Sequence, residues 1–223
     1  MTHAVILAAG TGSRFGGDKL LALLDGTPLI AHVEAATAHL PTTIVTSPTL
    51  STAVSPDHRE LSAPCHPELS APGHRELSAP GQRELSAPCH PERNEQSERS
   101  RGTDVIINPA PERGMAHSLR LADAAIDPND ALLVLLGDMP WITRAIVDAV
   151  IAAAGDADVC YPVRAGIGGH PVYFSPRARA KIAALPDGDS LRSLRDDPSL
   201  TRVTLPLDSD APYRDVDMLT DLP

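Results

Sequence analysis

Aromatic residues are scarce in this chain of 223 residues, which has one tryptophan, three tyrosines and two phenylalanines. A core built without them must come from Ala, Val, Leu and Ile, which favours parallel strands packed between helices. Cysteine is also scarce, since the three thiols are too few for a disulfide framework. We therefore expect a reduced, cytoplasmic location.

Long apolar runs and an excess of positive charge are missing as well. No apolar stretch reaches the length of a membrane span or a signal peptide, so no membrane partner is expected. The formal net charge of −10 at pH 7 argues against nucleic acid as a partner, because phosphate backbones attract basic surfaces. Any affinity for phosphate must therefore come from a local group of residues.

An eight-residue repeat interrupts the chain between residues 51 and 102. Its units begin at His58, His66, His74, Gln82 and, in degenerate form, His90. Each unit offers one leucine and a helix-breaking proline, so we interpret 51–102 as a disordered, low-complexity insertion into a single domain that spans 1–223. The cysteines and histidines of the repeat could instead bind a metal, but their spacing does not match structural zinc sites.

A glycine-rich loop follows the first apolar run and carries Gly10, Gly12, Arg14 and Lys19. Glycine lets backbone N–H groups approach an anion closely, and the guanidinium and ammonium groups supply charge that pairs with phosphate oxygens. The spacing fits neither a dinucleotide-binding fingerprint nor a P-loop. The alternative is an ordinary turn whose charged groups are solvated.

Apolar spacing predicts alternating strands and helices along the rest of the chain. Strands are expected at 43–46, 103–108, 131–137 and 158–163. Helices are expected at 27–40 and 114–126, and a third helix is expected to follow Pro140 and to end at residue 154. In the first helix, Thr27 and Pro28 are good cap and first-turn residues. Right-handed crossovers between such strands give an α/β fold with a parallel sheet.

Asp138 is the strongest single candidate for a functional residue. It follows the most apolar predicted strand, so its carboxylate stands at the sheet edge where α/β proteins bind ligands. A carboxylate is a hard oxygen ligand suited to Mg²⁺. Alternatively, Asp138 only caps the helix that follows Pro140.

Two further segments are candidates for contact with a ligand. Gly114 and Ser118 lie at a predicted helix start, where small residues admit a ligand to free N–H groups; the alternative is an ordinary capped helix. His170 follows two glycines and could contact a substrate, or it could be a satisfied structural histidine.

These motifs together resemble the MobA-like nucleotidyltransferase family, and within it the molybdenum cofactor cytidylyltransferases. The matching segments are Leu-Ala-Ala-Gly-x-Gly-x-Arg-Phe-Gly-Gly-x-Lys at 7–19, Asn-x5-Gly-Met-x-x-Ser-Leu at 108–119, Leu-Gly-Asp-Met-Pro at 136–140, Gly-His-Pro-Val at 169–172 and Asp-Val-Asp at 215–217. The resemblance implies a three-layer, Rossmann-like (GT-A type) nucleotidyltransferase domain with a mostly parallel sheet.

The resemblance also implies a reaction, in which CMP passes from CTP to the phosphate of molybdopterin and pyrophosphate leaves. CTP is favoured because Ala9 stands where guanylyl-transferring relatives usually have glycine. A molybdoenzyme or its chaperone would accept the product. The alternatives are a guanylyl- or other nucleotidyltransferase that acts on a different phosphorylated small molecule, and a catalytically silent nucleotide-binding protein.

Site residues follow from the same resemblance. The nucleotide would contact Leu7, Ala8, Ala9, Gly10, Gly12, Arg14, Lys19, Asn108 and Ser118. Arg14, Lys19 and Asp138 would act in catalysis, and Asp138 and Asp217 would hold Mg²⁺. The phosphorylated pterin would contact Gly114, Gly169, His170, Pro171 and Asp189. Because Ser190 and Leu191 stand where the family has small residues, we expect Leu191 to lie where the acceptor approaches.

Overall fold

The computed structural model describes residues 1–10, 19–50, 59–61 and 103–222. Contacts group these residues into one unit, Met1–Pro64 with Arg101–Pro223, whereas the second unit, Cys65–Ser100, lies outside the described residues. Arg59–Leu61 form a strand, β5, although they fall inside the range assigned to the insertion. Disorder in the rest of 51–102 stays a prediction.

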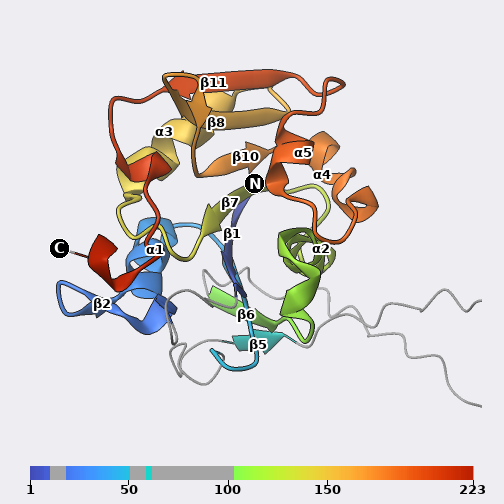
Figure 1. Ribbon diagram of the computed structural model, residues 1–223. Coiled ribbons are helices and arrows are strands. Elements are labelled where there is room, and N and C mark those ends of the chain that lie inside the picture. The colour runs from blue at the N-terminus through green and yellow to red at the C-terminus, as the bar shows by residue number, and fades with distance from the viewer. Residues whose placement is uncertain (11–18, 51–58, 62–102, 223) are drawn as a thin grey trace, which may run out of the picture. The chain divides into compact units, whose positions relative to one another are not determined.

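A mostly parallel sheet forms the centre of the described unit (Figure 1). Its strand order among the described residues is β11-β8-β10-β7-β1-β4-β6-β5, with β9 beside β8. Strand β10 runs antiparallel to β7 and β8, and β9 runs antiparallel to β8. The bounds are β1 Thr2–Ala8, β4 Thr42–Thr46, β6 Thr103–Ile107, β7 Ala131–Leu136, β8 Val159–Arg164, β9 Ile167–Gly168, β10 Val172–Phe174 and β11 Arg202–Pro206.

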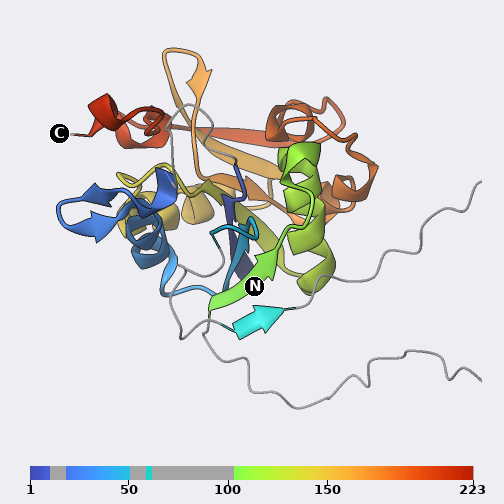
Figure 2. The same cartoon turned by 60° about the horizontal axis from the view of Figure 1, so that its bottom comes forward.

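Helices cover both faces of the sheet at its centre, which explains why the central strands β1 and β7 contain continuous apolar runs. Alternate residues of β1 point to opposite faces: Ala4 and Ile6 pack with α1 and α3, and Val5 and Leu7 pack with α2, α4 and α5. Figures 1 and 2 show α1 and α3 on one side of β1 and α2 on the other. The bounds are α1 Leu29–Thr37, α2 Met115–Ala125, α3 Arg144–Ala154, α4 Pro176–Arg179 and α5 Leu191–Arg195.

Short elements complete the described unit. A two-stranded hairpin consists of β2 Leu23–Leu24 and β3 Thr27–Pro28. The 3-10 turns are η1 Lys19–Leu21, η2 Pro111–Arg113, η3 Ile182–Ala184, η4 Ala211–Tyr213 and η5 Leu219–Asp221. Among the described residues no helix combines the length and apolarity needed to cross a membrane.

The α/β fold class is confirmed, and the predicted strands agree with β4, β6, β7 and β8 to within one residue at each end. The first helix differs, because it begins at Leu29 and Thr27 pairs with Leu24 in the hairpin. Thr27 is therefore not a helix cap. Asp138 is not one either, since the side chain of Thr143 caps α3 by accepting a hydrogen bond from the Ile146 N–H.

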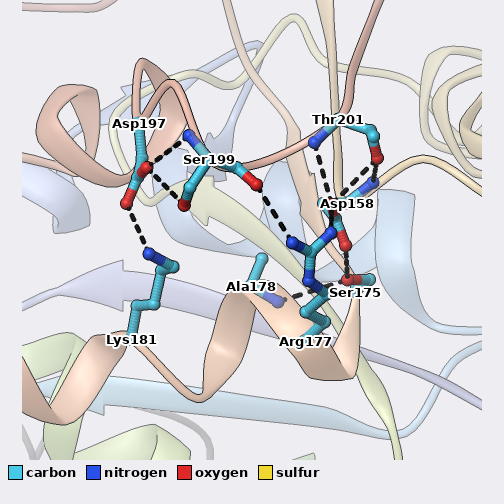
Figure 3. A network of polar contacts seen from close by, with 8 residues as sticks. All are labelled: Asp158, Ser175, Arg177, Ala178, Lys181, Asp197, Ser199 and Thr201. Carbon is cyan, nitrogen blue, oxygen red and sulfur yellow. Dashed lines mark hydrogen bonds and ion pairs between the residues drawn. The ribbon is translucent and has the colours of Figure 1, made fainter.

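A polar network joins the start of β8 to α4 and to the segment before β11 (Figure 3). The Asp158 carboxylate accepts hydrogen bonds from Ser175 Oγ at 3.0 Å, Arg177 Nη1 at 2.7 Å and Thr201 N at 2.8 Å. Burial alone would raise the pKa of Asp158, but the bonds from Thr201 and Ser175 and the charge of Arg177 outweigh it and lower the pKa. Beside this network, the Asp197 carboxylate accepts hydrogen bonds from the Lys181 ammonium and the Ser199 hydroxyl. The network fixes the packing of these elements.

Acid should destabilise the fold through His3 in β1. Burial lowers the pKa of His3 to about 4 from its ordinary 6.5; the charge of Asp130 opposes this effect and that of Arg179 adds to it. The unfolded chain therefore binds the proton more tightly, so the contribution of His3 to stability is complete above about pH 6.5 and is lost as the pH falls towards 4. When the pH falls from 7 to 5, the free energy of unfolding of the wild type should drop by about 1–2 kcal/mol more than that of His3→Gln.

Urea unfolding at the two pH values measures this difference. The imidazole Nε2 of His3 lies 2.9 Å from Thr43 Oγ1, and a glutamine amide retains a polar partner for that hydroxyl. Equal losses in both proteins would show that another group causes the acid sensitivity.

Candidate active site

The carboxyl ends of β1 and β7 lie side by side and define one edge of the sheet. The two strands are parallel neighbours, with Leu7 opposite Leu136, and the Gly137 N–H donates to the Leu7 carbonyl at 3.0 Å. A methyl group on Gly137 would lie only 3.1 Å from the Ile30 side chain, so a glycine at this position lets α1 pack closely against the end of β7. Gly10 and Asp138, which follow the two strands, are thereby brought to the same edge.

A cavity of about 660 Å³ opens at this edge. That volume is suited to a ligand of nucleotide size. Of the residues expected to contact the nucleotide, the acceptor or the metal, the lining contains Leu7, Ala8, Ala9, Gly10, Lys19, Gly114, Ser118 and Asp138. Residues from four separate segments of the sequence thus share one cavity. Gly12 and Arg14 lie outside the described residues, so their roles stay predictions.

Asn108 supports the cavity without lining it. Its buried side chain donates from Nδ2 to Ser118 Oγ at 2.9 Å and accepts from the Ala110 N–H at 2.9 Å. The amide therefore orients the Ser118 hydroxyl. Gly114, which precedes α2, has a φ of +87°, and a methyl group there would lie 3.2 Å from Gly188 Cα. Both constraints explain a glycine at this position.

The segment after β4 also lines the cavity, and sequence reasoning missed it. Its lining residues are Ser47, Pro48, Thr49 and Leu50. Strand β4 is parallel to β1, with Thr46 opposite Ala8, so its continuation reaches the same edge. That position at the end of a parallel strand was a usable signal. The segment has no charged residue and no glycine that would mark it as a phosphate-binding loop.

Three aspartates, called the acidic cluster below, lie together with Lys19 at the edge of the cavity that Asp138 lines. The Lys19 ammonium donates to Asp138 Oδ2 at 2.9 Å and to Asp217 Oδ1 at 3.2 Å. The carboxylates of Asp138, Asp215 and Asp217 offer oxygen atoms that all lie within 4.8 Å of one another. Fully buried Val216 donates its N–H to the Asp138 carbonyl at 3.0 Å, which fixes the C-terminal segment beside β7.

Asp215 is a second residue that sequence reasoning missed. The usable signal was the spacing Asp-Val-Asp, in which two acidic residues flank an apolar residue that the core takes up. Burial and then the charges of Asp217 and Asp138 raise the pKa of Asp215. Burial lowers the pKa of Lys19, but hydrogen bonds and charges from Asp138 and Asp217 outweigh it, so that pKa is raised. Lys19 therefore remains a cation.

The acidic cluster fits a divalent cation. Asp138 Oδ1 is buried and has no hydrogen-bond partner among the described residues. A buried carboxylate oxygen without a partner is costly unless a cation or water binds it. Three closely spaced carboxylates are the hard oxygen donors that Mg²⁺ and Mn²⁺ accept.

The Gly-His-Pro segment at 169–171 packs against the η4 turn. The His170 N–H donates to the Pro212 carbonyl at 2.8 Å, and a methyl group on Gly169 would lie 2.3 Å from that oxygen. The ring Nδ1 of His170 lies 3.4 Å from the Val134 carbonyl, and burial lowers the pKa of the ring. Pro171 is buried. None of the three lines the 660 Å³ cavity.

The segment 189–191 was expected to lie beside the acceptor. Asp189 accepts bonds from Ser190 N at 2.8 Å and Ser193 Oγ at 2.5 Å, so its carboxylate stabilises the start of α5. It does not line the 660 Å³ cavity, and its contact with the acceptor stays a prediction. Leu191 is 5% exposed and packs in the core. The expectation that Leu191 lies where the acceptor approaches is therefore wrong, because the first turn of α5 directs it inward.

Comparisons with solved structures identify the same fold in other proteins. Rv0371c from Mycobacterium tuberculosis H37Rv has 22% sequence identity, with 99% of this chain and 94% of that chain covered and a TM-score of 0.70. Its complex with manganese has 19% identity, coverage of 99% and 95%, and a TM-score of 0.67. Molybdopterin-guanine dinucleotide biosynthesis protein A from Archaeoglobus fulgidus has 14% identity, coverage of 99% and 94%, and a TM-score of 0.57.

Sequence comparison identifies the family. None of the curated proteins compared with the chain matches it. The family model described as the MobA-like NTP transferase domain matches residues 4–203, which include most of the first strand, the glycine-rich loop and Asp138. Since this match covers most of the chain, the protein belongs to the MobA-like NTP transferase domain family.

Proposed function

We propose that this protein transfers CMP from CTP to the phosphate of molybdopterin, with Mg²⁺ as cofactor and pyrophosphate as second product. The observation that carries the proposal is that Asp138 belongs both to the lining of the 660 Å³ cavity and to the acidic cluster. A nucleotide in the cavity would therefore have its phosphates beside a metal site. The membership in an NTP transferase family supports the same reaction class.

The cavity residues would bind the donor nucleotide. Its apolar walls, formed by Leu7, Ala8 and Leu136, suit the base and ribose, and the Ser118 hydroxyl offers a hydrogen bond. Lys19 lines the same cavity beside Asp138, where its ammonium can pair with triphosphate oxygens. Bound Mg²⁺, held by Asp138 and Asp217, would neutralise charge that develops on the phosphates.

The transfer needs no nucleophile from the protein. An oxygen of the acceptor phosphate forms a bond to the α-phosphorus of CTP as the bond to the bridging α,β-oxygen breaks, and pyrophosphate leaves. The protein's part is to hold donor and acceptor in line and to supply positive charge through Lys19. The product would then pass to a molybdoenzyme or its chaperone.

Pyrophosphate release measures the proposed reaction directly. The purified protein is assayed anaerobically with Mg²⁺, molybdopterin and one of CTP, GTP, ATP or UTP. We expect CTP to support the highest kcat/KM, because Ala9 lines the cavity and its methyl group narrows the space beside the base. A preference for GTP would overturn the choice of nucleotide, and the absence of turnover with all four would favour a binding protein.

A further inference from the structure

The Lys19 ammonium joins the two carboxylates that are the proposed ligands of Mg²⁺. Its Nζ lies 2.9 Å from Asp138 Oδ2 and 3.2 Å from Asp217 Oδ1. The Lys19 side chain is only 12% exposed, so water and salt screen these contacts less than they would at an open surface. A cation that belongs to the protein therefore already neutralises part of the charge that would attract a metal.

The position of Lys19 combines a fixed backbone with a flexible side chain. Lys19 begins η1, and the next residue, Leu20, is buried in the core. The Ala22 N–H donates to the Lys19 carbonyl at 3.1 Å and closes the turn. The four-carbon stem of a lysine carries a compact charge that can reorient while the backbone stays in place. The ammonium can thus leave the carboxylates without any rearrangement of the core.

A divalent cation and the ammonium compete for these carboxylates. Two cations that share a carboxylate oxygen lie within about 5 Å of each other, and repulsion between a single and a double positive charge at that distance is worth about tenfold in affinity even in bulk water. Asp138 Oδ1, which has no hydrogen-bond partner among the described residues, and the Asp215 carboxylate are not bonded to Lys19 by any contact described above. The ammonium therefore weakens metal binding at the acidic cluster and does not abolish it.

An anion in the 660 Å³ cavity is what can draw the ammonium away. Burial alone would lower the pKa of Lys19, but hydrogen bonds and charges from Asp138 and Asp217 outweigh it and raise that pKa. Loss of the proton at neutral pH therefore does not free the carboxylates. Lys19 also lines the 660 Å³ cavity, so an anion bound there reaches the same ammonium. The triphosphate of a nucleotide is such an anion.

We propose that Lys19 competes with the metal for Asp138 and Asp217 until a nucleotide binds and its triphosphate draws the ammonium away. This inference rests on the nucleotidyl transfer proposed above and adds an order of assembly to it. The protein without nucleotide binds divalent cations weakly, and a bound nucleotide strengthens that binding. By thermodynamic reciprocity, the metal strengthens nucleotide binding by the same factor.

Titration of the full chain with Mn²⁺, followed by the electron paramagnetic resonance signal of free Mn²⁺, tests the inference without turnover. Mn²⁺ is suited to the same oxygen ligands as Mg²⁺. Without nucleotide, the neutral variants Lys19→Met and Lys19→Gln should bind Mn²⁺ at least about tenfold more tightly than the wild type. Lys19→Arg keeps the charge and should stay within about threefold of the wild type. Urea unfolding verifies the fold of each variant.

Arg214→Gln is the matched control for the loss of a positive charge. Arg214 is an exposed neighbour of Asp215 in the sequence, and its guanidinium lies over the Trp141 ring and donates to the Asp221 carbonyl. Because that charge is screened and is directed to a carbonyl, its removal should change the Kd for Mn²⁺ by less than about threefold. An increase in affinity as large as that of Lys19→Met would show that net charge alone controls metal binding, and would overturn the inference.

A non-hydrolysable CTP analogue completes the test. It should lower the Kd of the wild type for Mn²⁺ at least about tenfold, and by a smaller factor in Lys19→Met, which has no ammonium to displace. Equal affinities of the wild type and both neutral variants for Mn²⁺ alone would overturn the inference, whatever the turnover. The predicted affinities without any release of pyrophosphate from CTP would overturn the proposed reaction and leave the inference standing.

Discussion

Asp138→Asn should lower the rate of nucleotidyl transfer at least about a hundredfold while the protein stays folded. The carboxylate Oδ2 accepts from Lys19 and Oδ1 has no partner among the described residues, so the side chain is available to a cation. An amide has the same shape but no charge, and neutral oxygen is a much weaker ligand for Mg²⁺. Loss of charge stabilisation at a single position in a transfer site typically costs a hundredfold to a thousandfold in rate.

The rate is measured as pyrophosphate release at saturating CTP, with urea unfolding to verify the fold. Asp148→Asn is the matched control, because Asp148 is an exposed acidic residue on α3 whose carboxylate pairs with Arg144 and His39. The control should keep wild-type turnover. If Asp138→Asn retained the same activity as Asp148→Asn, the metal would not be held where the acidic cluster lies.

Arg179→Met should lower the free energy of unfolding by about 3–5 kcal/mol. The guanidinium of Arg179, in α4, is 4% exposed and donates to Asp123 Oδ1 at 2.7 Å. It also donates to the carbonyls of residues 123, 126, 127 and 130, which end α2 and lead into β7. Methionine fills much of the volume but leaves these oxygens without their donor.

Urea unfolding near pH 7 gives the comparison, and Arg144→Met is its control. Arg144 is 64% exposed and pairs with Asp148 one helical turn away, so its loss should change stability by about 0.5 kcal/mol or less. Similar losses in the two variants would show that the bonds of Arg179 do not carry the stability of this junction.

Features that depend on a local pattern were predicted from the sequence. A continuous apolar run that ends in Gly137 and Asp138 is typical of a buried parallel strand followed by a site residue, and β7 has that form. The hairpin β2–β3 was missed although it has a local signal. Asp25 and Gly26 both have positive φ, at 51° and 77°, and Asp-Gly between apolar residues is a strong hairpin sequence.

Features that depend on distant parts of the chain were not predictable in this way. Asp215 reaches the site because the Val216 N–H bonds to the Asp138 carbonyl, and the local spacing Asp-Val-Asp does not reveal which distant part of the chain these acidic residues meet. Asp217 was expected from the family resemblance alone. The expectation that Leu191 faces the acceptor was wrong, because a family pattern of small residues does not reveal which side chains of a short helix are buried in the core. The 660 Å³ cavity arises from this long-range packing.

A crystal structure with Mg²⁺ and a non-hydrolysable CTP analogue would show where the donor nucleotide and the metal bind. We expect the cytosine beside Leu7, Ala8 and Ala9, the triphosphate against Lys19, and the metal bound by Asp138 and Asp217. Mg²⁺ or the nucleotide bound elsewhere, with the acidic cluster and the 660 Å³ cavity unused, would contradict it.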